Sequence, residues 1–228
     1  MAKVLLVCGY GPGISEAVAR KFGSEGFVVA LVGRTRSRVD QAAQSLGDAK
    51  ITAKGFQCDV GDPEAVKTLV AEVQASLGPI SVLHWNAYSG KAGDLTTAPT
   101  AELRDVFDVA VHGLLGALQA ALPDLKKGGG ALLVTGGGLS SYADAANQAA
   151  VGWGAMGLAL AEAAQHKLVG LLNQKLAPDG VYVGEVTVLA LVKGTIFDSG
   201  AATLEPATVA AKFWEMFQSR SAVYTEVS

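Results

Sequence analysis

The sequence predicts an α/β fold, in which a doubly wound parallel β-sheet carries helices on both faces. Short apolar runs alternate with longer segments of helical periodicity, the pattern of repeated strand–helix–strand units. The apolar runs are almost continuously hydrophobic, which is typical of strands buried on both faces. At 228 residues the chain has the length of one domain, and no linker or repeat divides it. We therefore expect a single domain over residues 1–228.

Seven strands and six helices account for this pattern. Pro63 and Pro206 each stand where a proline fits the first turn of a helix, and Asp62 is a suitable N-cap. The expected strands are Lys3–Cys8, Phe27–Val32, Ala53–Cys58, Ser81–Trp85, Ala131–Thr135, Val181–Val188 and Ala222–Thr225. The expected helices are Gly13–Gly23, Ser37–Leu46, Pro63–Leu77, Thr100–Leu125, Ala145–Ala177 and Pro206–Gln218.

Composition excludes several classes of protein. Half of the residues are apolar and 17% are charged, which suits a large core and excludes a disordered chain. The net charge of −3 argues against nucleic acid as a partner. Cys8 and Cys58 end apolar runs and are expected to be buried free thiols in a reducing cytoplasm. No secretion signal is expected, because the N-terminal apolar run is short and leads directly into a glycine-rich turn, and no membrane span is expected, because the apolar stretch 145–161 contains polar residues and glycines.

A glycine-rich turn follows the first expected strand and leads directly into a helix. The turn reads Cys8-Gly9-Tyr10-Gly11-Pro12-Gly13-Ile14-Ser15. Glycines let the backbone turn sharply and approach a phosphate, and the helix N-terminus presents free N–H groups to it. The turn therefore predicts a site for a dinucleotide pyrophosphate. The alternative is a structural strand–turn–helix that binds no ligand.

With the later motifs added, the chain resembles the short-chain dehydrogenase/reductase family along almost its whole length. The glycine turn matches that family's phosphate loop, and Asp59-Val60 and Asn86-Ala87-Tyr88 match its motifs after the third and fourth strands. The segment 176–183 and the tail 213–227 also resemble this family, the tail resembling a bacterial subgroup. The resemblance implies a Rossmann-like sheet in the order 3-2-1-4-5-6-7, a nicotinamide dinucleotide cofactor and a homodimer or homotetramer.

The resemblance also assigns residues to the cofactor. Gly9 and Gly13 match the first two glycines of the family, and the third falls on Ser15. Arg34, with Arg36 close by, stands where an arginine accommodates the 2′-phosphate of NADP, and no acidic residue is present there to favour NAD. Asp59 corresponds to the residue that receives the adenine amino group. The full set of expected cofactor-binding residues is Gly9, Tyr10, Gly11, Pro12, Gly13, Ile14, Arg34, Asp59, Val60, Asn86 and Ala87.

The family's catalytic tetrad of asparagine, serine, tyrosine and lysine is replaced. Matching the flanking sequence places Ala110, Gly137 (or Gly136), Leu158 and Glu162 at the four positions. Leucine cannot transfer a proton, and glutamate reverses the charge that would stabilise a tyrosinate. Each positioned acid–base group contributes about 10²–10⁴ in rate, so the family's usual mechanism is not expected here.

Other polar side chains could replace these groups, although each also has an ordinary structural interpretation. Tyr88 is the best substitute proton donor, or else an aromatic wall of the cleft. Tyr142 follows the fifth strand with two serines, and Glu162 and His166 are spaced to pair on one helix face. No metal site is expected, because the histidines are scattered and the cysteines lack ligand spacing. The segment 193–204, which should cover a substrate, is short and rich in small residues.

Three functions remain open from the sequence. The leading hypothesis is an NADP(H)-binding member of the family with a binding, regulatory or otherwise non-standard role. The second is an NADP-dependent oxidoreductase that uses another proton donor, with Tyr88 as the candidate. The third is a structural subunit that binds no cofactor. In each case we expect a cytoplasmic homo-oligomer without nucleic-acid or membrane partners, and no motif names a substrate.

Overall fold

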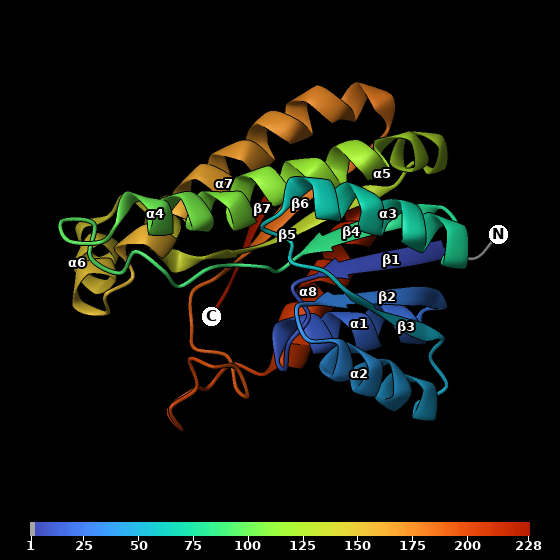
Figure 1. Cartoon of the computed structure of the whole chain (residues 1–228), viewed down its shortest axis with the longest axis horizontal. Coiled ribbons are helices and arrows are strands. Elements are labelled where there is room, and N and C mark those ends of the chain that lie inside the picture. The colour runs from blue at the N-terminus through green and yellow to red at the C-terminus, as the bar shows by residue number, and fades with distance from the viewer. Residues whose placement is uncertain (1–2) are drawn as a thin grey trace.

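A seven-stranded sheet forms the centre of the computed structural model, which describes residues 3–228 (Figure 1). All neighbouring strands pair in parallel, in the order β3-β2-β1-β4-β5-β6-β7. This confirms the expected order and the Rossmann-like fold. The strands are β1 (Lys3–Cys8), β2 (Phe27–Gly33), β3 (Ala53–Gln57), β4 (Ile80–Trp85), β5 (Ala131–Gly137), β6 (Tyr182–Val188) and β7 (Tyr224–Val227).

Helices cover both faces of the sheet, as the hydrophobic strands predict (Figure 1). One face carries α1 (Ile14–Ser24), α2 (Arg36–Asp48) and α8 (Pro206–Ser219). The other carries α3 (Pro63–Leu77), α5 (Leu114–Gly128) and α7 (Met156–Leu176), with α4 (Thr100–Phe107) and α6 (Asp144–Gly152) beyond the strand ends. Two apolar cores result, and alternate strand residues such as Leu5 and Leu6 point into opposite ones.

Local sequence signals explain several helix ends. Asp62 caps α3, because its Oδ1 accepts hydrogen bonds from the backbone N–H groups of Glu64 at 3.0 Å and Ala65 at 3.2 Å. Pro63 and Pro206 occupy the first turns of α3 and α8. These expectations are confirmed.

The expected single helix Ala145–Ala177 is wrong, because the chain forms α6 and α7 with a break between them. Gly154 has a φ of 60°, a left-handed conformation that ends α6. The loop before α4 fits into the break: a Cβ at Gly93 would lie 2.4 Å from the Gly154 carbonyl oxygen, and Gly157 N–H donates to the Ala92 carbonyl at 2.9 Å. Tertiary contacts therefore start α7 at Met156.

The expected helix Thr100–Leu125 is continuous but not uniform. A π-helical segment, η1 (Asp108–Gly113), separates α4 from α5, which runs on to Gly128. A Cβ at Gly113 would lie 1.9 Å from the Val60 carbonyl oxygen, so only glycine lets the helix pass the end of β3. Among the described residues, Thr100–Gly128 is the one helix whose length and apolarity would suffice to cross a membrane. Its Leu114 and Leu125 are fully buried, as in a core helix of a folded domain.

Candidate functional site

The glycine turn lies at the carboxyl end of β1, next to the end of β4. Gly9 and Gly13 have φ values of 84° and 89°, which favour glycine. Side chains would also collide: a Cβ at Gly9 would lie 2.5 Å from Ala87 Cα, and one at Gly13 would lie 2.6 Å from Thr195 Cγ2. The turn thus needs glycine at the two positions that match the family's first two glycines, and it leads into the N-terminus of α1.

Ser15 occupies the position of the third glycine and has a role that the sequence did not predict. It is buried, and its Oγ bonds both to the Gly11 N–H and to the Gly11 carbonyl, each at 2.9 Å. Tyr10 N–H donates to the Val32 carbonyl at 2.7 Å, which fixes the same turn to β2. Tyr10 and Ile14 are partly buried against the core under the turn, and Pro12 lies on the exposed side between them.

A cavity of about 130 Å³ lies at the carboxyl end of β2 and contains the predicted Arg34. Arg38, one helical turn further along, lines the same cavity, whereas Arg36 turns away and pairs with Asp40 at 2.7 Å. The second arginine that lines this cavity is therefore Arg38, whereas Arg36, which the sequence places close to Arg34, does not line it. The complete lining is Tyr10, Gly33, Arg34, Thr35, Arg38 and Val39.

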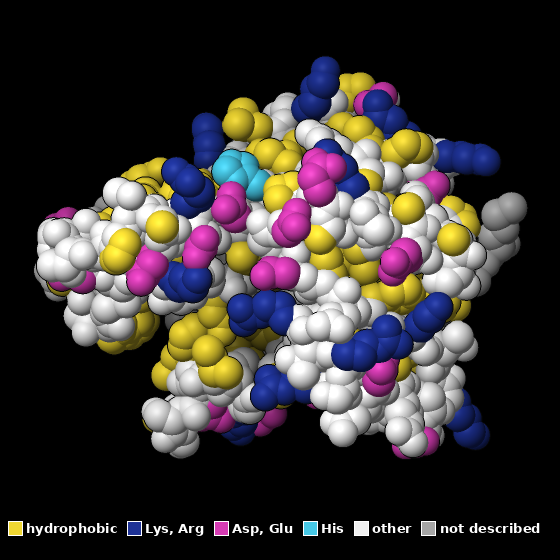
Figure 2. Space-filling model, viewed as in Figure 1, with side chains coloured by type: hydrophobic (Ala, Val, Ile, Leu, Met, Phe, Trp, Pro, Cys, Tyr) yellow, Lys and Arg dark blue, Asp and Glu magenta, His cyan; other side chains and the backbone are white. Residues whose placement is uncertain are grey.

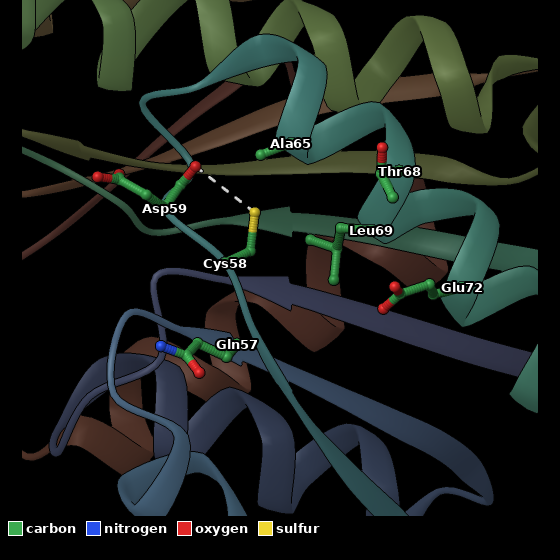
Figure 3. Close-up of a pocket in the computed structure, with 7 residues that line it drawn as sticks. All are labelled: Gln57, Cys58, Asp59, Ala65, Thr68, Leu69 and Glu72. Atoms are coloured by element: carbon green, nitrogen blue, oxygen red, sulfur yellow. Dashed lines mark hydrogen bonds between the residues drawn. The ribbon is translucent and has the colours of Figure 1, made fainter.

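A second cavity, of about 420 Å³, lies between the end of β3 and α3 (Figure 3). Asp59 lines it, and its carboxylate points away from the Leu69 and Glu72 side chains and accepts the Gly61 N–H at 3.0 Å. Cys58 lies on the same wall, and burial and the Asp59 charge raise the pKa of its thiol to about 11. Cys8 is also a buried free thiol, and Val60 is buried behind Asp59.

The end of β4 closes against the glycine turn. Asn86 donates from its backbone N–H to the Cys8 carbonyl at 2.9 Å and from Nδ2 to the Gly9 carbonyl at 3.3 Å. Ala87 follows in contact with Gly9. The structure therefore brings together the predicted residues of both motifs at the point where the strand order reverses, which is where open α/β sheets bind ligands.

Two of the four positions assigned to the tetrad, Gly137 of β5 and Glu162 of α7, meet at the carboxyl end of β5. A Cβ at Gly137 would lie 2.4 Å from Glu162 Oε1, so the carboxyl group of Glu162 fills the space of the side chain that Gly137 lacks. Leu158 is buried one turn before Glu162. Ala110 is buried on η1, in a small apolar cluster with Ala161 of α7.

A second buried carboxyl group, Glu185 of β6, lies beside Gly136 in the same way. A Cβ at Gly136 would lie 2.2 Å from Glu185 Oε1. The expected Glu162–His166 pair is wrong, because His166 Nδ1 bonds instead to Glu185 Oε1 at 2.8 Å. Burial, and then the charge of Glu185, raise the pKa of Glu162 to about 7. Glu185 was not expected in this cluster, since it lies within the apolar strand β6 and belongs to no motif.

The substitute donors differ in where their side chains lie. Tyr88 is 42% exposed, packs its ring on Phe197 at 5.6 Å and has a pKa raised by burial. Tyr142 is 87% exposed and lies outside the site, while Ser140 donates to the Gly137 carbonyl at 2.8 Å. Within residues 3–228 no cluster of His, Cys, Asp or Glu has the geometry of a metal site.

The segment 193–204 lies over the glycine turn. It starts and ends at a bridge between Val192 and Leu204, and Thr195 packs against Gly13. Ile196 remains 78% exposed at its tip, and Phe197 reaches Tyr88. Figure 2 shows a hollow between this segment and the rest of the molecule, with Lys and Arg side chains on both sides.

Comparison with known proteins agrees with this geometry. The family model for short chain dehydrogenases matches residues 3–195. The chain is 32% identical to meso-2,3-butanediol dehydrogenase of Serratia marcescens over 184 residues, which cover 81% of this chain and 69% of that protein.

Solved structures share the fold at lower sequence identity. A metagenomic short-chain oxidoreductase in complex with NADP has a TM-score of 0.81 at 22% identity, covering 99% of this chain and 95% of the other. L-sorbose reductase from Gluconobacter frateurii, complexed with NADPH and L-sorbose, has a TM-score of 0.86 at 20% identity, covering 100% and 95%. By its fold and by its match to the family model, this chain belongs to the short-chain dehydrogenase/reductase family.

Proposed function

We propose that the protein binds NADP(H) and that it does not use the tyrosine–lysine mechanism of its family. The observation that carries the proposal is the glycine turn, which closes against Ala87 beside a cavity lined by Arg34 and Arg38. Such a turn at a helix N-terminus suits a pyrophosphate. The proposed cofactor contacts are those expected from the sequence, together with Arg38. Ser15 is proposed to hold the glycine turn in place through its bonds to Gly11.

Preference for NADP over NAD follows from the charges at the end of β2. Among the described residues, no carboxylate lines the Arg34 cavity, and the carboxylate of Asp40 accepts a hydrogen bond from Arg36. Guanidinium groups match a 2′-phosphate, whereas the ribose hydroxyls of NAD are usually held by a carboxylate. The metagenomic oxidoreductase and the sorbose reductase, which share the fold, bind NADP and NADPH.

The proposed non-standard role follows from the side chains at the carboxyl end of β5. A bound nicotinamide ring would supply hydride chemistry, and the protein would have to supply a proton and a positive neighbour for the developing alkoxide. Leu158 is apolar and buried, and Glu162 is anionic when it loses its proton. These residues do not provide the tyrosinate chemistry of the family, which favours a binding or regulatory role.

The experiment that tests this proposal is a fluorescence titration with NADPH and NADH, followed by an assay of NADPH oxidation with a panel of small carbonyl compounds. We expect tight binding of NADPH, weaker binding of NADH and no turnover. Absence of binding to both would contradict the proposal and favour a structural subunit without cofactor. Robust NADPH oxidation would contradict the non-standard role.

A second function, an NADP-dependent oxidoreductase, is favoured by one observation. Tyr88 lies directly after the Asn86-Ala87 turn, and burial raises its pKa further above its ordinary value, so its hydroxyl carries a proton at neutral pH. If turnover occurs, Tyr88→Phe should abolish it while leaving NADPH affinity unchanged. We further propose that the protein is cytoplasmic and forms a homodimer or homotetramer.

A further inference from the structure

Two carboxyl groups fill the space beside two consecutive glycines at the carboxyl end of β5. Glu162 comes from α7 and fills the space beside Gly137, and Glu185 comes from β6 and fills the space beside Gly136. The Glu185 side chain is 1% exposed, so it sits in the interior of the protein. A buried carboxylate is costly unless it is paired, protonated or offered a positive charge.

Neither carboxyl group is fully satisfied by the described residues. Glu185 Oε1 receives His166 Nδ1 at 2.8 Å and the Thr187 hydroxyl at 2.8 Å, but its buried Oε2 has no hydrogen-bond partner. Glu162 Oε2 is also buried without a partner. Each of the two carboxyl groups therefore keeps one buried oxygen able to accept a proton or to face a cationic group.

The place of the cluster in the fold indicates which ligand group is near. In doubly wound sheets, the first three strands hold one mononucleotide and the next three hold the other, at the carboxyl ends of the strands. Gly9 and Arg34 belong to the first half, so the adenosine phosphates lie there. Gly137 and Glu185 belong to β5 and β6 of the second half, where the nicotinamide half would lie.

We propose that the Glu162–Glu185 pair makes this site selective for the oxidised dinucleotide, NADP⁺. The oxidised nicotinamide ring carries a positive charge and the reduced ring carries none, so an ionised Glu162 attracts the first and not the second. The inference rests on the proposed binding of NADP(H) and adds the redox state that the site prefers. A protein of this kind would respond to the oxidised cofactor without converting it.

The selectivity depends on pH, because Glu162 must lose its proton to attract the ring. Its pKa, raised to about 7 by burial and by Glu185, places that change near neutral pH. The other titratable groups around the pair are His166, which is bonded to Glu185, and Tyr224 of β7, which stacks on His166 at 4.1 Å. β5 offers Glu162 no charged side chain, and on η1 Asp108 and His112 bond to each other at 2.6 Å.

Thermodynamic linkage between Glu162 ionisation and cofactor binding gives the direction of the pH dependence. As pH rises through about 7, Glu162 ionises and the affinity for NADP⁺ rises, while the affinity for NADPH lacks this contribution. Binding of NADP⁺ in turn lowers the Glu162 pKa and releases a proton. The 2′-phosphate of both cofactors titrates near pH 6, but this contribution cancels in the ratio of their affinities.

The test measures dissociation constants of NADP⁺ and NADPH by calorimetry at about pH 6 and about pH 8.5, on either side of the Glu162 pKa. For the wild type we expect the preference for NADP⁺ to increase about tenfold between the two pH values, the equivalent of a one-unit pKa shift. Near pH 7, buffers of different ionisation enthalpy should reveal proton release with NADP⁺ and not with NADPH.

Two variants and one control complete the design. Glu162→Gln should remove the pH dependence of the ratio and the proton release, and the exposed Glu215→Gln on α8 should leave both unchanged. Glu185→Gln removes the charge that raises the Glu162 pKa, so the change in the ratio of the two affinities should occur at lower pH. This second variant keeps the inference testable if Glu162→Gln fails to fold. A ratio independent of pH in the wild type, or pH dependence that survives Glu162→Gln, would overturn the inference. If neither cofactor binds, the proposed function itself fails, which is a different result.

Discussion

Arg34 and Arg38 face the same cavity at the end of β2, and the intervening Arg36 does not. Arg34 precedes α2 and Arg38 lies in its first turn, and both line this cavity together with Tyr10 of the glycine turn. Since guanidinium–phosphate bonds are charge-assisted and planar, we propose this pair as the basis for a preference for NADP(H) over NAD(H).

Arg34→Ala should weaken NADPH binding by about tenfold or more while changing NADH binding little, because only NADPH carries the 2′-phosphate. Arg36→Ala is the matched control: the Arg36 guanidinium is bonded to Asp40, and its loss should leave the preference intact. Fluorescence titrations of the three proteins check this. Equal affinity of the wild type for NADPH and NADH would contradict it.

Glu162 should also make folding stability depend on pH. Its pKa is raised from 4.5 to about 7 in the folded protein, so the folded state holds a proton that the unfolded state has already lost in this range. The stabilisation from this group is therefore present at acid pH and is lost as pH rises from 4.5 towards 7. Urea unfolding at several pH values should show a larger decline for the wild type than for Glu162→Gln. Parallel curves for the two proteins would contradict the assignment.

At the scale of the elements, the helix Thr100–Gly128 depends on its closest approach to the end of β3. Gly113 lies where the helix is π-helical, against the Val60 carbonyl. A side chain at this position would force the helix away from β3 and open the apolar core behind it, where Leu114 is fully buried.

Gly113→Ala should therefore destabilise the protein by about 1–3 kcal/mol or more, the usual cost of overpacking. Gly128→Ala, near the end of the same helix, meets no atom within 4 Å and should have little effect or a slightly stabilising one. Thermal or urea unfolding of both variants distinguishes the two positions. Similar stability of Gly113→Ala and the wild type would show that the helix can shift without cost.

Elements defined by short-range signals could be predicted from the sequence, and those set by tertiary contacts could not. The alternation of apolar runs and the Asp62–Pro63 cap marked the strands and α3 almost to the residue. The break at Gly154 was missed, because it depends on the loop at Gly93 packing into it.

In the candidate site, too, the motifs could be predicted from the sequence and the contacts between distant segments could not. The glycine turn and Arg34 were visible as motifs, but their placement beside Ala87 and Arg38 required the fold. The partner of His166 was predicted on its own helix, and the structure supplies Glu185 from β6 instead. The bonds of Ser15 across the turn and the contacts of Gly136 and Gly137 with two glutamates could not be predicted, because each depends on how the folded chain brings residues together.

At the scale of the whole molecule, large apolar side chains remain exposed along α6 and α7. Leu160 and Leu171 on α7 are 44% and 58% exposed, and Trp153 at the end of α6 is 69% exposed. Both helices belong to the layer that also contains α4 and α5 (Figure 1). Contiguous patches of exposed apolar side chains mark surfaces that bind another protein chain.

We expect a second copy of the chain to cover α7, together with the neighbouring helix Thr100–Gly128, in a homodimer or homotetramer. Light scattering at micromolar concentration should give twice or four times the monomer mass. Leu171→Glu should reduce this mass, because association would bury the new charge without a partner. Lys212→Glu, on α8 at the opposite face of the sheet, changes charge outside the proposed interface and should not affect assembly. A monomeric mass for the wild type would contradict the interface, while the same NADPH affinity in Leu171→Glu as in the wild type would show that each subunit carries a complete cofactor site.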